Sequence, residues 1–147
     1  MTALAADTPR VFPIGLDHNE PLELDVVKVF GGSTLEWDTT NGGVSAYAGG
    51  TGKFAGFAKE GGDNVGGALG DIVIDVARKG IVVLVLSATV GLGNVGDTVY
   101  AATDDDTFNL TLSGNMAIGK ISRVVTAGTS GNNEVEVAYE AVGFSSV

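Results

Sequence analysis

Alternation of apolar and polar residues is the feature that most limits how this chain can fold. Apolar residues recur at every second position in Asp71–Val76, Phe108–Leu112 and Glu134–Tyr139. A period of two places these side chains on one face of a β-strand. Outside residues 31–70, no segment has the spacing and caps of an amphipathic helix. The sequence therefore predicts an all-β protein, either a compact β-barrel or a sandwich.

Glycine is the most over-represented residue type. It supplies 23 of the 147 residues, which is about twice its usual share of roughly 7%. Residues 31–70 hold 13 of these glycines, with the short apolar pieces Val44–Tyr47 and Lys53–Ala58 between glycine pairs. This glycine-rich segment indicates either short strands joined by turns or a loop packed on a neighbour.

Two further segments extend the β pattern. Leu24–Phe30 is rich in β-branched residues and ends at a Gly-Gly pair, so it is expected to form a hairpin with Ser33–Trp37. After an expected turn at residues 78–80, Ile81–Leu86 is apolar on both faces. Such a strand is covered by its own core on one side and by a second layer or another subunit on the other. The candidate subunit-interface residues are Ile81, Val83 and Val85.

The first 23 residues are expected to form an extended N-terminal arm, followed by a single β-rich domain at residues 24–147. Pro9, Pro13 and Pro21 each fix their own φ and favour extended geometry in the preceding residue. The arm either frays, as proline-bearing termini often do, or becomes ordered against a partner. The apolar residues available for such a contact are Val11, Phe12, Ile14 and Leu16.

Composition narrows the classes of partner. The chain has the usual length of one domain, and 18 acidic against 8 basic residues give it a net charge of −10. This charge disfavours nucleic acid and anionic lipid as partners. The longest apolar run is Ile81–Leu86, far too short to cross a bilayer, and the first residues lack the features of a secretory signal. Synthesis in the cytoplasm is expected, without disulfides because cysteine is absent.

Motifs for catalysis or cofactor binding are weak. His18 is the only histidine, and it lies in the proline-bearing arm, so a catalytic triad or a zinc site is not expected. The segment Gly49–Lys53 has the composition of a phosphate-binding loop, but it lacks the first glycine and the final hydroxyl residue of that motif. We therefore expect no enzyme activity, no cofactor and no metal.

The run Asp104–Asp106 has two interpretations. Its carboxylates could bind a calcium ion, but an EF-hand loop spaces its acids at alternate positions and ends in a glutamate, whereas Asn115 occupies that place. The flanking residues instead indicate a connection between two strands. The sequence favours a solvated hairpin tip with its like charges spread apart.

Residues 65–139 resemble a family of small proteins of tailed phages and prophages related to capsid decoration, or cement, proteins. The resemblance covers about half the chain and lies in the order of its motifs. These are Gly66–Asp71, the strand Ile72–Ala77, Gly80–Leu84, Val95–Ala101, Ile118–Ile121 and Glu134–Val137. The resemblance implies a decoration fold, in one form β-tulip-like, and a structural protein on the outer surface of the virion capsid. It also implies a homotrimer that clamps neighbouring major capsid subunits and has no enzyme activity.

On this hypothesis, Val11, Phe12, Ile14 and Leu16 are the capsid contacts, and the protein strengthens the head after synthesis in the bacterial cytoplasm. Several modest contacts joined in one trimer would together bind the capsid tightly. The alternative is a phage head-fibre or adhesin-type module that binds glycans, with Trp37, Tyr47 and the glycine-rich loops as a stacking platform.

Overall fold

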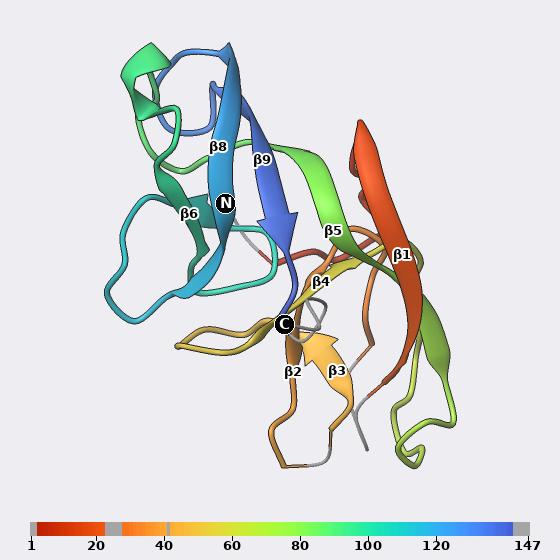
Figure 1. The fold of residues 1–147 in the computed structure, drawn as a ribbon. Helices are drawn as coiled ribbons and strands as arrows, with labels where there is room; N and C mark the ends of the chain where they lie inside the picture. Colours follow the sequence, from red (N-terminus) through yellow and green to blue (C-terminus); the bar gives the residue numbers. More distant parts are fainter. Residues whose placement is uncertain (1–2, 23–27, 41, 143–147) are drawn as a thin grey trace.

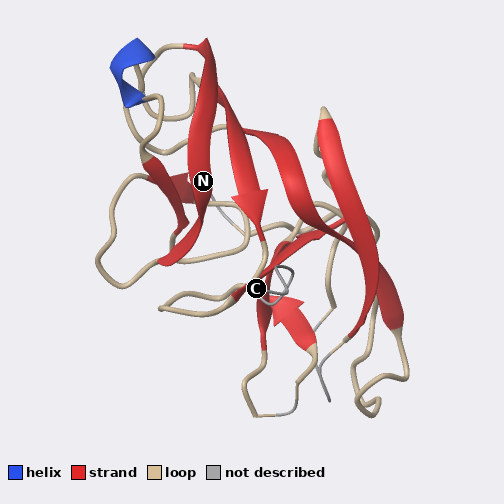
Figure 2. Cartoon of the chain, viewed as in Figure 1, coloured by secondary structure: helices blue, strands red, loops and turns tan. Residues whose placement is uncertain are grey.

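The computed structural model describes residues 3–22, 28–40 and 42–142. In this part of the chain the protein is all-β, as the alternation predicted, and the one helical element is the 3-10 turn η1 (Leu92–Asn94) (Figures 1 and 2). The strands are β1 (Ile14–Pro21), β2 (Thr34–Trp37), β3 (Val44–Ala46), β4 (Phe54–Ala58), β5 (Val73–Leu84), β6 (Thr98–Ala101), β7 (Phe108–Asn109), β8 (Met116–Thr126) and β9 (Glu134–Glu140).

The strands form a single antiparallel sheet in the order β3-β2-β4-β5-β9-β8-β6-β7, and β1 pairs with β5 outside this order. Figure 1 shows the sheet curled into a half-barrel, with β6, β8 and β9 in its upper part and β2, β3 and β4 in its lower part. The long strand β5 connects the two parts and carries the arm strand β1 along one side. The curl lets one sheet enclose buried residues on both of its faces.

β4 divides the buried residues into two cores, because all five of its residues are buried. Phe54 and Phe57 belong to the larger core, whereas Ala55 and Ala58 belong to the smaller one. The larger core lies among β4, β5, β6, β8 and β9, and the smaller core lies among β2, β3, β4 and the first half of β5. The buried members of the smaller core are Leu22, Val29, Leu35, Val44, Ala55, Ala58, Ile74 and Val76.

β5 is one continuous strand, so the predicted turn at residues 78–80 is wrong. Arg78 continues the strand because its side chain is buried, with Nη1 2.8 Å from Oε1 of Glu20 on β1. Gly80, at φ +148°, lets the strand bend where a side chain would be strained. The first half of β5 therefore packs into the smaller core and the second half into the larger one.

A row of glycines surrounds Tyr139. Gly80 of β5 and Gly119 of β8 lie opposite Tyr139 of β9, and Gly15 of β1 lies opposite Gly80. Residues directly opposite one another point to the same face of a sheet. The ring of Tyr139 thus covers positions that carry no side chain, and it packs edge-on against Phe57 at a centroid distance of 5.2 Å. At Gly119 the backbone also excludes a side chain, because a Cβ there would lie 2.0 Å from the carbonyl oxygen of Ala138.

The alternating segments fold largely as predicted. Val135, Val137 and Tyr139 of β9 are buried, and their neighbours in the strand are partly or fully exposed. The expected burial of Leu112 is wrong, because this residue is 70% exposed and β7 ends at Asn109. The cause is local: Oδ1 of Asn109 accepts the N–H of Thr111 at 3.0 Å, which turns the chain out of the strand.

The glycine-rich segment contains β2, β3 and β4 and the turns that join them. Part of the predicted strand Leu24–Phe30 lies outside the described residues. In its described part, Val29 pairs with Gly62 through two backbone hydrogen bonds of 2.8 and 2.9 Å. The predicted hairpin with β2 is therefore wrong here, because β2 pairs with β3 and β4 instead.

Candidate functional site

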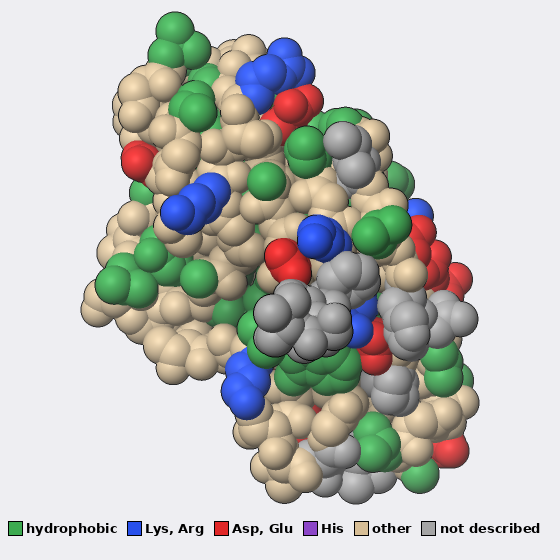
Figure 3. All heavy atoms as spheres, viewed as in Figure 1, with side chains coloured by type: hydrophobic (Ala, Val, Ile, Leu, Met, Phe, Trp, Pro, Cys, Tyr) green, Lys and Arg blue, Asp and Glu red, His purple; other side chains and the backbone are tan. Residues whose placement is uncertain are grey.

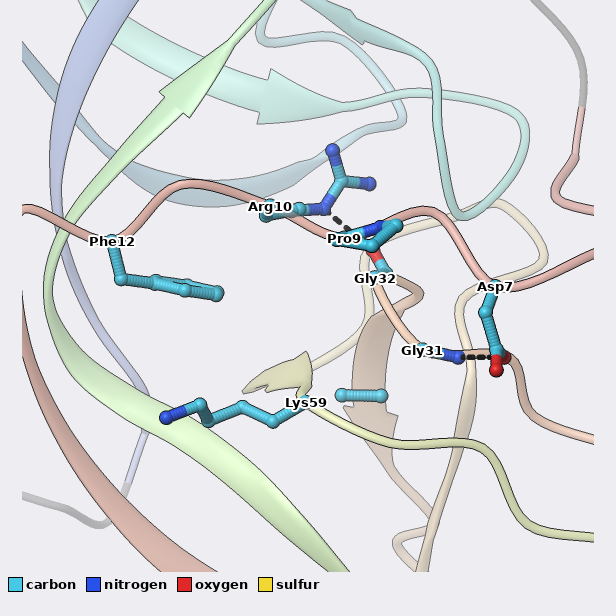
Figure 4. Close-up of a pocket in the computed structure, with 8 residues that line it drawn as sticks. Asp7, Pro9, Arg10, Phe12, Gly31, Gly32 and Lys59 are labelled. Carbon is cyan, nitrogen blue, oxygen red and sulfur yellow. Dashed lines mark hydrogen bonds between the residues drawn. The ribbon is translucent and has the colours of Figure 1, made fainter.

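The described start of the arm lies along the body of the same chain. The N–H of Leu4 donates to Oδ1 of Asp105 at 3.1 Å, and the N–H of Thr8 donates to the carbonyl of Gly31 at 2.7 Å. Oδ1 of Asp7 accepts the N–H of Gly31 at 2.8 Å (Figure 4). These polar contacts fix the path of the arm over the connection between Val29 and β2.

Arg10 is the central anchor of the arm. Its Nε donates to the carbonyl of Gly32 at 2.5 Å (Figure 4), and its guanidinium carbon lies 5.4 and 5.2 Å from the ring centroids of Phe57 and Phe108. Burial lowers the pKa of Arg10, and the hydrogen bond to Asp106 opposes that shift. The cation is therefore held between two aromatic rings and one carboxylate, a stable arrangement because its charge is compensated.

The predicted capsid contacts have different environments. Phe12 is partly buried and lies 6.2 Å, between ring centroids, from both Phe57 and Tyr139. The arm is thus ordered against its own chain, which differs from the expectation that it needs a partner, because Phe12 fills a gap in the larger core. Val11 is 63% exposed and Leu16 is 55% exposed, so both remain accessible to a partner. The side chain of Ile14 lies outside the described residues.

β1 is an outer strand of the sheet. In the described ranges it pairs with β5 alone, and Figure 1 shows it at the right-hand side of the sheet. The N–H of Leu22 donates to the carbonyl of Ile72 at 2.9 Å. The backbone groups of successive residues alternate in direction along an antiparallel strand. Because the N–H of Leu22 points toward β5, the backbone groups of Asn19 and Pro21 point away from β5. Pro21, which has no N–H, therefore stands where no donor is needed, and no further described strand pairs with this edge.

The predicted subunit-interface residues lie side by side on the half-exposed face of β5 and its continuation. Ile81, Val83 and Val85 are all partly exposed, whereas Val82 and Leu84 between them are buried. Ion pairs lie beside this face: Lys79 of β5 is 3.9 Å from Glu140 of β9, and Arg123 of β8 is 2.9 Å from Glu136, which lies opposite Val83 on β9. A central apolar strip with charged residues at its margins is the usual composition of a protein interface.

Apolar surface is otherwise divided among small areas on the face that Figure 3 shows. Hydrophobic side chains there form separate groups, with Lys and Arg side chains close to Asp and Glu side chains. The most exposed large hydrophobic residues are Leu92, Leu112, Val65 and Val11, which come from different parts of the chain. None of these groups alone has the extent of an obligate interface.

The prediction of a solvated tip at Asp104–Asp106 is wrong. Asp105 is 4% exposed, and its Oδ2 accepts the hydroxyl of Ser33 at 2.7 Å. With Asp106 paired to Arg10 and Asp105 bound to Leu4, the run fastens the arm to the body. Among the described residues, no group of three or more His, Cys, Asp or Glu side chains could hold a metal ion. Sequence alone did not reveal this role, because the partners lie 72 to 101 residues away.

A small pocket lies between the arm and the body. Its volume is about 210 Å³, and Figure 4 shows Pro9, Phe12, Gly32 and Lys59 around it. Nζ of Lys59 bonds Asp17 at 2.7 Å, and this hydrogen bond raises the pKa of Lys59. The lining of the pocket combines the apolar groups of Pro9 and Phe12 with the charged groups of Asp7, Arg10 and Lys59.

The glycan platform predicted at Trp37 and Tyr47 is not present as such. Tyr47 is 2% exposed. The guanidinium carbon of Arg78 lies 5.2 Å from the ring of Trp37. Gly49–Lys53, one of the glycine-rich loops of that platform, connects β3 to β4. The side chain of His18 lies outside the described residues. Two exposed, neighbouring rings are therefore not available here for stacking on a sugar.

No helix within the described ranges is long and apolar enough to span a bilayer.

Comparisons with known proteins identify no relative of this chain. No protein-family model, curated protein or solved structure matches this chain.

Proposed function

We propose that this protein is a capsid decoration protein of a tailed phage, which binds the outside of the head as a homotrimer and bridges neighbouring major capsid subunits. One observation carries the proposal. The segments that resemble the decoration family fall on β5, β6, β8 and β9 and on the turns before β5 and β6. These four strands are consecutive neighbours in the sheet; the second half of β5 and β6, β8 and β9 surround the larger core, and the first half of β5 extends into the smaller one. The resembling segments thus belong to one contiguous body and are not scattered pieces.

The charge of the chain supports an external position. At a net charge of −10, the protein is repelled by packaged DNA inside the shell. A protein of this charge on the outer surface has no such repulsion to overcome. The absence of cysteine is compatible with exposure to any redox environment.

Two surfaces suit the two kinds of contact that a decoration protein makes. The strip formed by Ile81, Val83 and Val85 suits a second copy of this chain, because it is apolar and partly exposed, with charged residues beside it. The free edge of β1, with Val11 and Leu16 exposed near it, suits an extended strand of a capsid subunit.

The edge contact can be tested with a pair of proline substitutions. Asn19→Pro removes an outward-facing N–H that β5 does not use, and His18→Pro removes one that faces β5. Cosedimentation with expanded, undecorated phage heads should show binding of the unaltered protein. Asn19→Pro should stay folded and lose most binding, whereas His18→Pro should lower the melting temperature. Undiminished binding of Asn19→Pro would exclude the edge as the contact.

The trimer can be tested by sedimentation velocity. Val83→Glu places a charge in the apolar strip and should convert trimers to monomers. Val95→Glu, at a 52% exposed position beyond η1, is the matched control and should leave the trimer intact. A protein that is monomeric at high concentration before any substitution would contradict this part of the proposal.

A glycan array separates the decoration protein from the glycan-binding alternative. Because Tyr47 is buried and Arg78 stacks on Trp37, no glycan is expected to bind. Reproducible binding of one glycan class, lost in Trp37→Ala, would favour the adhesin-type function instead.

A further inference from the structure

A cavity of about 570 Å³ opens between the start of the arm and the hairpin formed by β2 and β3. We call it the hairpin cavity. Its wall combines five separate stretches of the chain, represented by Leu4, Phe30, Glu36, Tyr47 and Thr103. The lining is mostly apolar, and the volume lies within the range of pockets that bind ligands or side chains of a partner. This cavity is separate from the edge of β1 and from the strip on β5.

The hairpin cavity is acidic at the Tyr47 end. Oη of Tyr47 donates to the carbonyl of Gly50 at 2.7 Å. Burial raises the pKa of Tyr47, and the nearby carboxylates of Glu36 and then Asp104 raise it further. Glu36, Tyr47 and Asp104 all line the cavity, so two carboxylates lie in the wall that contains Tyr47 and give it a negative potential.

The other charged groups of the lining do not cancel that potential. The carboxylate of Asp105 is buried and bound to Leu4 and Ser33. Nζ of Lys28 lies 5.1 Å from the ring centroid of Phe30. The lining thus carries three carboxylates and one ammonium group. A cationic group entering beside Glu36 and Asp104 would be favoured, and an anionic one would be repelled.

The wall also contains a strained backbone. Thr103 has φ +65° and is the one non-glycine residue with positive φ in the described chain. The N–H of Asp104 donates to the carbonyl of Ala102 at 2.7 Å, which makes a γ-turn centred on Thr103. A β-branched residue rarely adopts this conformation, and such strain gathers at ligand clamps and switch regions. The turn places Asp104 in the wall of the hairpin cavity.

We propose that the hairpin cavity binds an extended segment of a partner protein in which an apolar side chain is followed by lysine or arginine. The apolar side chain packs against Leu4 and Phe30, and the cation lies at Glu36 and Asp104. Charge complementarity selects this occupant, because a cation makes charge-assisted hydrogen bonds with carboxylates that an acidic or neutral segment cannot make. The inference rests on the proposed function, in which the partner is a capsid subunit.

The full-length protein, labelled with ¹⁵N, can be titrated with the peptide acetyl-Ala-Leu-Arg-Ala-amide at millimolar concentration. We expect shifts of the amide signals of Leu4, Ala48, Thr103 and Asp104, whose residues line the cavity. The peptide with glutamate in place of arginine should bind at least about fivefold more weakly, which corresponds to one partly exposed ion pair.

Matched variants locate the site. Asp104→Asn should weaken the arginine peptide about fivefold, whereas Glu134→Gln on β9 should not change its affinity. Ala48→Trp, at an exposed position of the rim, should block the cavity without disturbing the core. Equal shifts with both peptides, shifts elsewhere, or no effect of Asp104→Asn would overturn the inference.

The titration contains no phage head, so its outcome is independent of the proposed function. Heads that bind the protein while the peptides do not would refute the hairpin cavity alone. If the arginine peptide shifts the predicted amide signals but the protein does not bind heads, the decoration function is refuted. A segment with an apolar and a basic side chain would then remain the proposed class of ligand.

Discussion

Nη2 of Arg10 lies 3.0 Å from Oδ1 of Asp106, and 7% of the side chain of Arg10 is exposed. This ion pair joins the arm to the connection between β6 and β7, which is 96 residues further along the chain. Because the same guanidinium lies against two rings and donates to Gly32, one residue sets the register of the arm on the body.

Replacing Arg10 should destabilise the protein strongly. Arg10→Ala leaves the carboxylate of Asp106 without its cation and should lower the free energy of unfolding by about 3 kcal/mol. Arg10→Lys keeps the charge but loses the planar guanidinium group and its stacking on Phe57 and Phe108, so a loss of about 1 to 2 kcal/mol is expected. Urea denaturation of Arg10→Ala, of Asp106→Ala and of the double variant that combines them gives the coupling energy. A coupling near zero would mean that the two side chains do not stabilise each other.

Gly32 should tolerate no side chain. It has φ +94°, and a Cβ there would lie 2.0 Å from the carbonyl oxygen of Thr8, so Gly32→Ala must displace the arm. Gly50, at φ +89°, has no neighbour within 4 Å of such a Cβ and is the matched control. Gly50→Ala should lose about 1 kcal/mol and Gly32→Ala about 2 to 3 kcal/mol in thermal unfolding. Similar losses would show that the contact with Thr8 is not tight in solution.

Stability should fall above the ordinary pKa of tyrosine. Burial raises the pKa of Tyr139 far above its ordinary value of 10.0, and the charge of Asp17 adds to the shift. Above about pH 10 the unfolded chain therefore loses the proton of Tyr139 while the native state keeps it. The unfolded state then binds fewer protons, so the contribution of this group is full below pH 10 and is lost as the pH rises further.

Tyr139→Phe tests this pH dependence. Oη of Tyr139 is buried with no hydrogen-bond partner in the described structure, so the variant should be as stable as the unaltered protein at pH 7, or up to about 1 kcal/mol more stable. Between pH 9 and pH 11, the free energy of unfolding of Tyr139→Phe should fall less than that of the unaltered protein. Tyr100→Phe on half-exposed β6 is the control. Identical pH profiles for Tyr139→Phe and the unaltered protein would contradict the assignment.

Relieving the turn at Thr103 should stabilise the protein. Thr103→Asn replaces a β-branched residue by one that tolerates positive φ, and a gain of about 0.5 to 1 kcal/mol is expected in urea denaturation. Thr107→Asn, in the same connection, is the control. A loss of stability in Thr103→Asn would indicate that the side chain of Thr103 makes a contact worth more than the strain.

Much of the fold could be predicted from sequence because period-two patterns report directly on burial. β9 and the first half of β5 followed their alternating residues into the two cores. The turn expected at residues 78–80 failed because a buried ion pair lets Arg78 remain in a strand. A charged residue followed by glycine gives the same local signal whether its partner lies in solvent or on a distant strand.

The contacts of the arm could not be predicted for a related reason. Phe12 and the run Asp104–Asp106 each carried a clear local signal, apolar for one and acidic for the other. Their partners, Tyr139 for Phe12 and Arg10 and Ser33 for the acids, are far along the chain. Only the closure of the sheet brings these residues together, and no short-range pattern encodes it.

Because β5 contributes residues to both cores and β4 is buried between them, neither half of the protein can melt while the other stays intact. A calorimetric scan should accordingly give one sharp transition, with the van't Hoff enthalpy equal to the calorimetric enthalpy. The slowest amide protons to exchange with deuterium should then lie along the middle of β5, where global opening is the only route to solvent.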